Sequence, residues 1–123
     1  MAKLLAWFEI PAVDFDRAVN FYQNVLQTEL GIVEGGGEKM GCFPNDDENV
    51  WGAVSYSPGF EPSDKGVIIS FGGGSDLNNF LQRVIENGGS VVKEKTKIEA
   101  DGMGYFALFL DTEGNKLGIY SEN

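Results

Sequence analysis

Residues 14–27, DFDRAVNFYQNVLQ, decide the fold, because their pattern returns later in the chain. Apolar side chains recur along this stretch at helical spacing, which predicts an amphipathic helix with Asp14 as its N-cap. This apolar stripe consists of Phe15, Ala18, Val19, Tyr22, Val25 and Leu26. Residues 75–89, SDLNNFLQRVIENGG, have the same pattern, with Ser75 or Asp76 as the N-cap. The second stripe consists of Leu77, Phe80, Leu81, Val84 and Ile85. Aligning Asp14 with Asp76 superimposes the apolar positions of the two predicted helices. The chain is therefore predicted to be internally duplicated.

Short apolar runs predict strands around each helix. The run before the first helix, KLLAWFEI, is expected to end before Pro11, which cannot donate a ladder hydrogen bond. The run before the second helix is GVIISF, at residues 66–71. Three strands are expected after each helix, within residues 29–43, 49–56, 90–98, 104–111 and 115–121, with an acidic loop at 45–49. Each half therefore has the order β-α-β-β-β.

The length of 123 residues fits one domain, 1–123, of the α+β class. The Pro, Gly and charged residues of 59–65 predict a linker between two modules, 1–58 and 66–123.

Composition excludes several classes of partner. The net charge of −10 repels nucleic acid, and no local basic cluster compensates for it. No apolar run approaches the length of about 20 residues that a membrane helix needs. The N-terminal apolar run is shorter than a signal-peptide core, and a single cysteine, Cys42, allows no internal disulfide, so we expect a cytoplasmic protein.

The chain contains no histidine. Histidine is the usual general base near neutral pH and the commonest metal ligand. Catalytic triads and histidine-bearing metal sites are thereby excluded, and carboxylates, tyrosines, lysines and one thiol remain for any chemistry.

Two stretches, WFEIPAVDFDRAVNFYQNVL at residues 7–26 and GYFALFLDTEGNKLGIYS at residues 104–121, resemble the vicinal oxygen chelate superfamily of glyoxalases, bleomycin-resistance proteins and extradiol dioxygenases. The resemblance covers essentially the whole chain. It implies two tandem β-α-β-β-β modules whose curled sheets surround a cavity. In metal-using members, four side chains on cavity-facing strands, usually His, Gln or Glu, hold a metal ion.

Carried over to this chain, those four positions have no metal-binding side chains. They fall on Trp7, Gly52, Ile68 (or Ile69) and Gly118. Metal ions need N, O or S donors in a near-fixed geometry, and these side chains supply none. We therefore expect no metal and no other cofactor, and Gly118 becomes a ligand position without its ligand.

Strand alternation and the resemblance together predict the lining of the cavity. The lining is expected to be aromatic and apolar with few polar groups, which suits a small, partly aromatic ligand. The predicted ligand-binding residues are Trp7, Glu9, Trp51, Gly52, Tyr56, Ile68, Ser70, Gly118 and Tyr120.

Three functions stay open at this point. The first is a metal-free small-molecule binding protein of the bleomycin-resistance type. The second is a metal-independent isomerase or lyase, with Glu9 as the base and Tyr56 or Tyr120 stabilising the developing charge. The third is a non-catalytic interaction module that acts by dimerisation. We favour the first of these functions. We also expect a homodimer, because curled sheets leave exposed edges that pairing can cover.

Overall fold

The computed structural model of the protein describes residues 4–45 and 50–123. Most of the predicted acidic loop at 45–49 lies outside the described residues. The elements follow the predicted order. They are β1 (Trp7–Pro11), α1 (Phe15–Leu26), β2 (Gly31–Gly35), β3 (Glu38–Cys42), β4 (Trp51–Tyr56), β5 (Ser70–Gly72), α2 (Leu77–Glu86), β6 (Ser90–Lys97), β7 (Tyr105–Leu110) and β8 (Lys116–Ser121).

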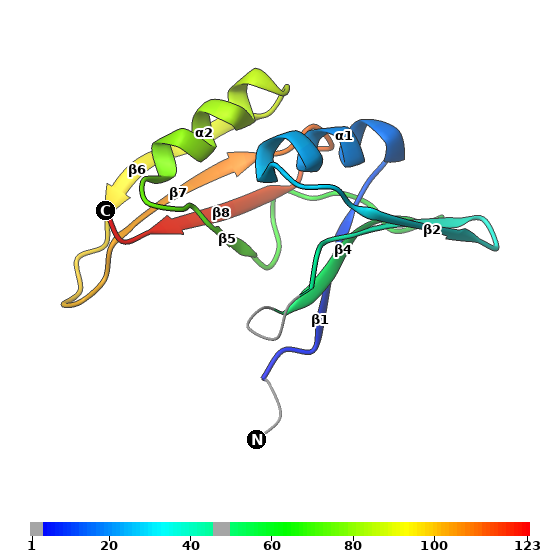
Figure 1. Cartoon of the computed structure of the whole chain (residues 1–123), viewed down its shortest axis with the longest axis horizontal. Helices are drawn as coiled ribbons and strands as arrows, with labels where there is room; N and C mark the ends of the chain where they lie inside the picture. The colour runs from blue at the N-terminus through cyan, green and yellow to red at the C-terminus, as the bar shows by residue number, and fades with distance from the viewer. Residues whose placement is uncertain (1–3, 46–49) are drawn as a thin grey trace.

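The strands form two four-stranded sheets, one from each half of the chain. Sheet A has the order β1-β4-β3-β2, and sheet B has the order β5-β8-β7-β6. In both sheets the first strand of the module pairs in parallel with the last, and the other pairs are antiparallel. Figure 1 shows both helices on the same side of the two curled sheets. The predicted α+β fold of two tandem modules is confirmed.

Both helices begin where their N-cap residues predict. The Asp14 carboxylate accepts a hydrogen bond from the Arg17 N–H, and the Asp76 carboxylate accepts one from the Asn78 N–H. Most of each apolar stripe is buried, and Val19 and Leu26 of α1 are half-buried. Ile85, which was predicted to belong to the second stripe, is 53% exposed. Phe21, outside the predicted stripe of α1, is buried against Phe109.

Two predicted strands have the wrong bounds. Strand β1 begins at Trp7, so Leu4, Leu5 and Ala6 of the predicted run lie outside it, and it extends through Pro11. Because β1 is an edge strand of sheet A, one side of its backbone needs no donors. Strand β5 is only Ser70–Gly72, so most of the apolar run at 66–71 lies outside it. Within that run Val67 is 93% exposed and Ile68 is 43% exposed.

A single hydrophobic core joins the two modules beneath the helices. It contains buried residues of both helices and both sheets, among them Ile10, Tyr22, Phe80 and Phe109. The helices also touch each other, since the Arg83 guanidinium donates to the Val25 carbonyl at 2.8 Å. None of the described helices is long and apolar enough to cross a membrane.

The turn between β7 and β8 fastens the second module to the first. The Tyr22 hydroxyl on α1 donates to the buried Asp111 carboxylate at 2.5 Å. The Asn115 side-chain amide donates both to that carboxylate, at 2.9 Å, and to the Pro11 carbonyl, at 2.8 Å. Burial, with the Asp111 charge beside it, raises the pKa of Tyr22 well above its ordinary value, so the phenol stays a donor.

Glu113, in the same turn, supplies the N-terminus of α1 with a second cap. Its carboxylate accepts from the Val13 and Asp14 N–H groups at 2.9 and 2.7 Å and pairs with Arg17 at 2.8 Å. Burial opposes ionisation of Glu113, but the hydrogen bonds from Arg17, Asp14 and Thr112 outweigh it and lower its pKa. The two modules are therefore held together within one chain.

Candidate functional site

Each sheet has one face against the helices and one face turned away from them, which we call the outer face. In sheet A, Ile10 and Val54 face the core. Alternation therefore places Trp7 and Glu9 on the outer face. Trp7 lies directly opposite Trp51, and the two indole rings are 5.4 Å apart at 74°.

Gly52 and Tyr56 lie on the other face of β4 from Trp7, which corrects the predicted lining. The parallel register pairs Phe8 with Gly52 and Ile10 with Val54, so even-numbered residues of β4 face the core side. A Cβ at Gly52 would overlap the Phe8 ring, so this glycine makes room for packing. Trp51 and Ala53 are the residues beside Trp7 on the outer face, and they carry no metal donor either.

In sheet B the four predicted residues do share the outer face. Ser70 pairs with Gly118 in the parallel register, and Tyr120 follows Gly118 on the same side. A Cβ at Gly118 would overlap the Ser70 hydroxyl and press on the Ile68 side chain at 3.3 Å. The space at Gly118 is therefore taken by Ser70.

Sequence reasoning missed part of this outer face. Phe106 pairs with Tyr120, Leu108 with Gly118 and Leu110 with Lys116, so all three side chains line it. The signal was present, because alternation in the run YFALFL separates them from the buried Ala107 and Phe109. The face is consequently more apolar than predicted.

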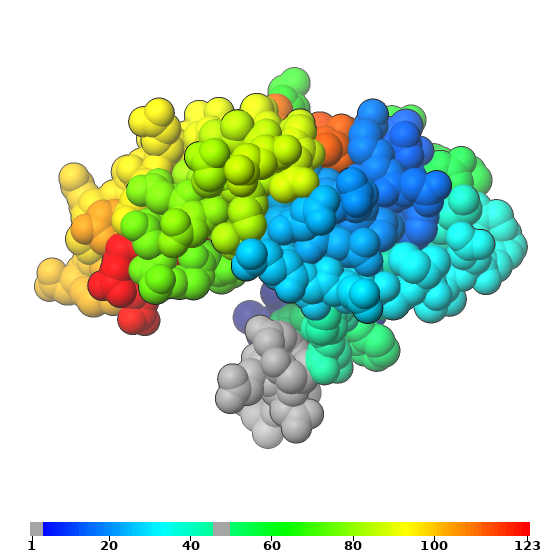
Figure 2. Space-filling view, turned by 45° about the horizontal axis from the view of Figure 1, so that its top comes forward, coloured from blue at the N-terminus to red at the C-terminus, as the bar shows by residue number. Residues whose placement is uncertain are grey.

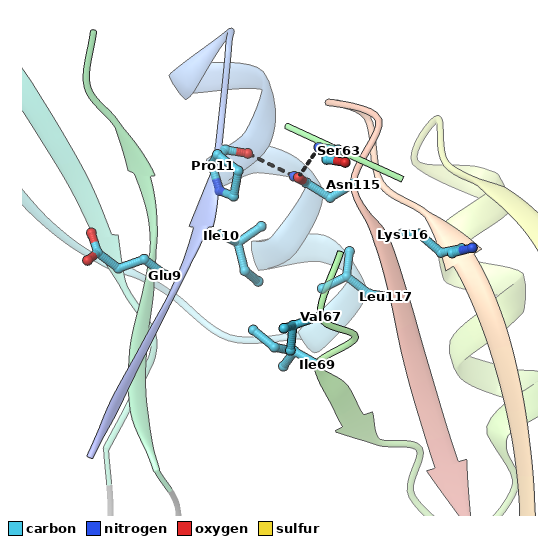
Figure 3. A pocket seen from close by; sticks show the side chains of 9 residues that line it. All are labelled: Glu9, Ile10, Pro11, Ser63, Val67, Ile69, Asn115, Lys116 and Leu117. Carbon is cyan, nitrogen blue, oxygen red and sulfur yellow. Dashed lines mark hydrogen bonds between the residues drawn. The ribbon is translucent and has the colours of Figure 1, made fainter. Parts of the chain in front are cut away.

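Glu9 does not pair with Lys116. Figure 3 shows Ile10 and Leu117 between the two sheets, with the Glu9 carboxylate and the Lys116 ammonium pointing away from each other. Glu9 is exposed, and its carboxylate accepts a hydrogen bond from the Ser55 hydroxyl at 2.9 Å. The small pocket between these strands, about 70 Å³, has room for a few water molecules only. The predicted ligand-binding residues therefore fall into separate groups.

A larger apolar groove of about 590 Å³ lies between the modules, at the C-terminal end of α1. Figure 2 shows the surface hollowed beneath this end of the helix. Its side chains are apolar or uncharged, and Ile68 and Ser70 of the predicted set are among them. The lining residues are Leu5, Phe8, Leu26, Thr28, Phe43, Pro44, Val50, Val67, Ile68, Ile69, Ser70, Phe71 and Gly72.

Sequence reasoning missed the core of this groove. Phe43 and Phe71 have ring centroids 6.0 Å apart, and Phe8 stacks on Phe43 at 5.7 Å. Phe8 belongs to β1, Phe43 directly follows β3, and Phe71 belongs to β5, so only the tertiary fold brings these rings together. In residues 4–45 and 50–123, no group of three Cys, Asp or Glu side chains could share a metal ion.

Paired β-α-β-β-β modules with a ligand-sized groove between them define the class of this protein. The chain belongs to the Glyoxalase/Bleomycin resistance protein/Dioxygenase superfamily, whose family model matches residues 4–119. No curated protein matches its sequence.

Solved structures share the fold at low sequence identity. Glyoxalase I from Zea mays superimposes with a TM-score of 0.74 at 14% identity over 95% of this chain, which spans only 45% of the maize enzyme. TnmS3, an antibiotic binding protein from Streptomyces sp. CB03234, has a TM-score of 0.68 at 17% identity, with 99% of this chain and 98% of that chain covered. A glyoxalase/bleomycin resistance protein from Albidiferax ferrireducens T118 has a TM-score of 0.66 at 18% identity, covering 97% and 99%.

Proposed function

We propose that this protein binds a small, uncharged and partly aromatic molecule in the apolar groove between its modules, without a metal ion. The observation that carries the proposal is the groove itself, whose volume of about 590 Å³ lies in the usual range for small-molecule sites. The full-length similarity to an antibiotic binding protein supports the same kind of function.

The lining determines the class of ligand. Phe8, Phe43 and Phe71 offer ring faces and edges, and aliphatic side chains surround them. Among the residues that the structure describes, no charged side chain lines the groove, although the chain carries a net charge of −10. Transferring a charged ligand from water into such a lining is costly, so an uncharged ligand is favoured. Thr28, which also lines the groove, supplies a hydroxyl group that can orient it.

The metal-free part of the proposal rests on side-chain chemistry. Trp7, Gly52, Ile68 and Gly118 occupy the positions that the resemblance assigns to metal ligands, and none carries a suitable donor. Trp51 and Ala53, the outer-face neighbours of Trp7, do not restore one. We further propose a cytoplasmic homodimer.

A glycine in the groove allows a direct test with Nile red, an uncharged apolar dye. A Cβ at Gly72, which lines the groove, meets nothing within 4 Å, so Gly72→Phe adds a ring at the edge of the groove without a clash at Cβ. We expect wild type to bind the dye saturably and Gly72→Phe to weaken binding at least tenfold. Gly35→Phe, at an equally open glycine of β2 outside the groove, is the matched control.

The proposal fails if wild type does not bind the dye. It also fails if Gly35→Phe weakens binding as much as Gly72→Phe, because the effect would then not be specific to the groove. Thermal melting of both variants checks that they remain folded.

A further inference from the structure

Both tryptophans of the chain meet at one place on the outer face of sheet A. Trp7 on β1 and Trp51 on β4 are register partners, with ring centroids 5.4 Å apart and planes at 74°. Neither belongs to the hydrophobic core, which lies on the other face of the sheet. Trp51 is 46% exposed, so this aromatic pair is open to solvent and core packing does not explain it.

A carboxylate accompanies the rings. Glu9 follows Trp7 by two positions on the same strand and so lies on the same face. It is exposed, and Ser55, which shares this face, donates a hydrogen bond to one of its oxygens at 2.9 Å. Neither salt bridge found among the described residues involves Glu9. Among residues 4–45 and 50–123, the Glu9 carboxylate is thus anchored by a neutral hydroxyl group and forms no ion pair.

The nearest basic residue of the same sheet does not reach this corner. Lys39 on β3 pairs with Tyr56 in the register, which places it on the opposite face, where its ammonium lies 5.8 Å from the Phe15 ring. Lys116 points away from Glu9 (Figure 3). Two indole rings at a steep angle, and one carboxylate that forms no ion pair with a described residue, therefore make up a site for positive charge.

We propose that the corner formed by Trp7, Trp51 and Glu9 binds an organic cation of the tertiary or quaternary ammonium class. Indole faces attract such cations through the ring quadrupole, while the methyl groups of the cation make apolar contact with the rings. Glu9 supplies the opposite charge, and the overall charge of −10 attracts cations and repels anions. None of these three residues lines the apolar groove, so the site does not depend on the groove being functional.

Intrinsic fluorescence reports directly on this corner, because the chain has no other tryptophan. The probe is choline, compared with its uncharged isostere 3,3-dimethylbutan-1-ol at matched ionic strength. We expect choline to change the emission saturably and the isostere to have at least a fivefold smaller effect. No saturable response to choline, or an equal response to the isostere, overturns the proposal. A second copy of the chain seated on this face would block choline and give the first of these results.

Two variants, each of which removes one negative charge, test the role of the Glu9 carboxylate. Glu9→Gln should raise the Kd for choline about threefold to fivefold, as expected for a solvent-exposed ion pair. Glu34→Gln, on β2 of the same sheet but facing the α1 side, should leave it unchanged. Equal weakening by both variants would show attraction by net charge alone and would overturn the site. Gly72→Phe, which blocks the groove, should leave choline binding intact, so the two proposals can fail separately.

Discussion

At the scale of single residues, Gly118 shows how one missing side chain shapes a face of the protein. The Ser70 hydroxyl occupies the place where a Cβ at position 118 would lie. Ser70 is the register partner of Gly118 on β5, so the two positions share one small volume. A larger residue at one of them therefore requires a smaller one at the other.

We expect Gly118→Ala to destabilise the protein by about 1 kcal/mol, the lower end of the range for overpacking, because the Ser70 hydroxyl can rotate away. Ser70→Ala removes that hydroxyl and should recover most of the loss in the double variant. Urea unfolding of the two single variants and the double variant measures the coupling. Additive effects would contradict the shared volume.

Gly52→Ala should cost more, about 2–3 kcal/mol, since a Cβ there overlaps a ring that cannot rotate away cheaply. That ring is Phe8, which packs against the core and stacks on Phe43. The same unfolding experiment ranks the two glycines. A Gly52→Ala variant as stable as wild type would mean that the Phe8 ring is free to move.

Strand alternation predicts well which face of a sheet each residue occupies, provided that one residue of the strand has been placed on the correct face. It places Trp7, Glu9, Ser70 and Gly118 correctly on the outer faces. It fails on β4, because the face of Gly52 depends on how β4 aligns with β1, and that register joins strands more than 40 residues apart. No local pattern in the sequence fixes such a register.

At the scale of elements, the N-terminus of α1 depends on Glu113 from the other module. The carboxylate is fully buried, with 0% side-chain exposure, and binds two backbone N–H groups and Arg17. The negative charge of ionised Glu113 is attracted to the partial positive charge at the N-terminus of α1, which stabilises the helix. Its lowered pKa means that the folded protein favours the charged form.

Glu113→Gln should lower the free energy of unfolding at pH 7 by about 1–3 kcal/mol, the range for hydrogen bonds to a charged group. Because the folded pKa lies below the ordinary value of 4.5, the stabilisation is complete above about pH 4.5 and is lost as the pH falls through the folded pKa. Denaturant unfolding between pH 3 and pH 7 should therefore show the gap to wild type closing in acid. Glu61→Gln, at an exposed carboxylate, is the control and should show no gap. A gap that is constant with pH would contradict the role of the charge.

Tyr22→Phe should destabilise the protein by about 1–3 kcal/mol, because it removes a donor from the buried Asp111 carboxylate. The raised pKa of Tyr22 adds a spectroscopic test. In wild type, one of the four tyrosines should resist alkaline ionisation until the protein unfolds, and Tyr22→Phe should lose that resistant signal. Four tyrosines that titrate together would contradict the buried network.

Elements were more predictable than their connections. N-caps and periodicity identify both helices to within a residue or two, since these signals are local. The stretch DTEGN, at residues 111–115, reads in sequence as a tight turn between strands. Its contacts with Pro11, Asp14 and Tyr22 depend on the packing of the two modules, which no local signal contains.

At the scale of the whole molecule, the protein has the fold of its family without the side chains that bind a metal ion in metal-using members. The chain has the paired modules of the superfamily, but the positions that the resemblance assigns to metal ligands carry no donors. Purified protein should therefore hold less than about 0.1 equivalent of zinc, nickel, manganese or iron, because a site needs at least three protein ligands. Elemental analysis after purification without chelators tests this. About one equivalent of any of these metals would contradict it.

The outer faces of the two sheets diverge within one chain, which leaves apolar surface open. Ile68, at 43% exposure, lies beside Gly118, the register partner of Leu108 on the outer face of sheet B, and Val67, which precedes it, is 93% exposed. Pairing with a second copy would cover this surface. We expect sedimentation equilibrium at tens of micromolar to give twice the 13.4 kDa chain mass. Val67→Glu should shift the protein toward monomer, whereas Ile85→Glu, on exposed α2 surface, should not, and a wild-type monomer would contradict the prediction.

The contact between Glu113 and the start of α1 joins residues far apart in the sequence, and this separation affects the order of folding. Glu113 and Val13 are 100 residues apart in the chain. While the protein is being synthesised, the first module leaves the ribosome long before Glu113. Until Glu113 follows, the backbone N–H groups of Val13 and Asp14 lack their hydrogen-bond acceptor. Contacts of such long sequence separation form slowly and late. A nascent chain stalled before residue 111 should therefore show weaker amide-exchange protection at the start of α1 than the finished protein, even though every residue of that helix is already present.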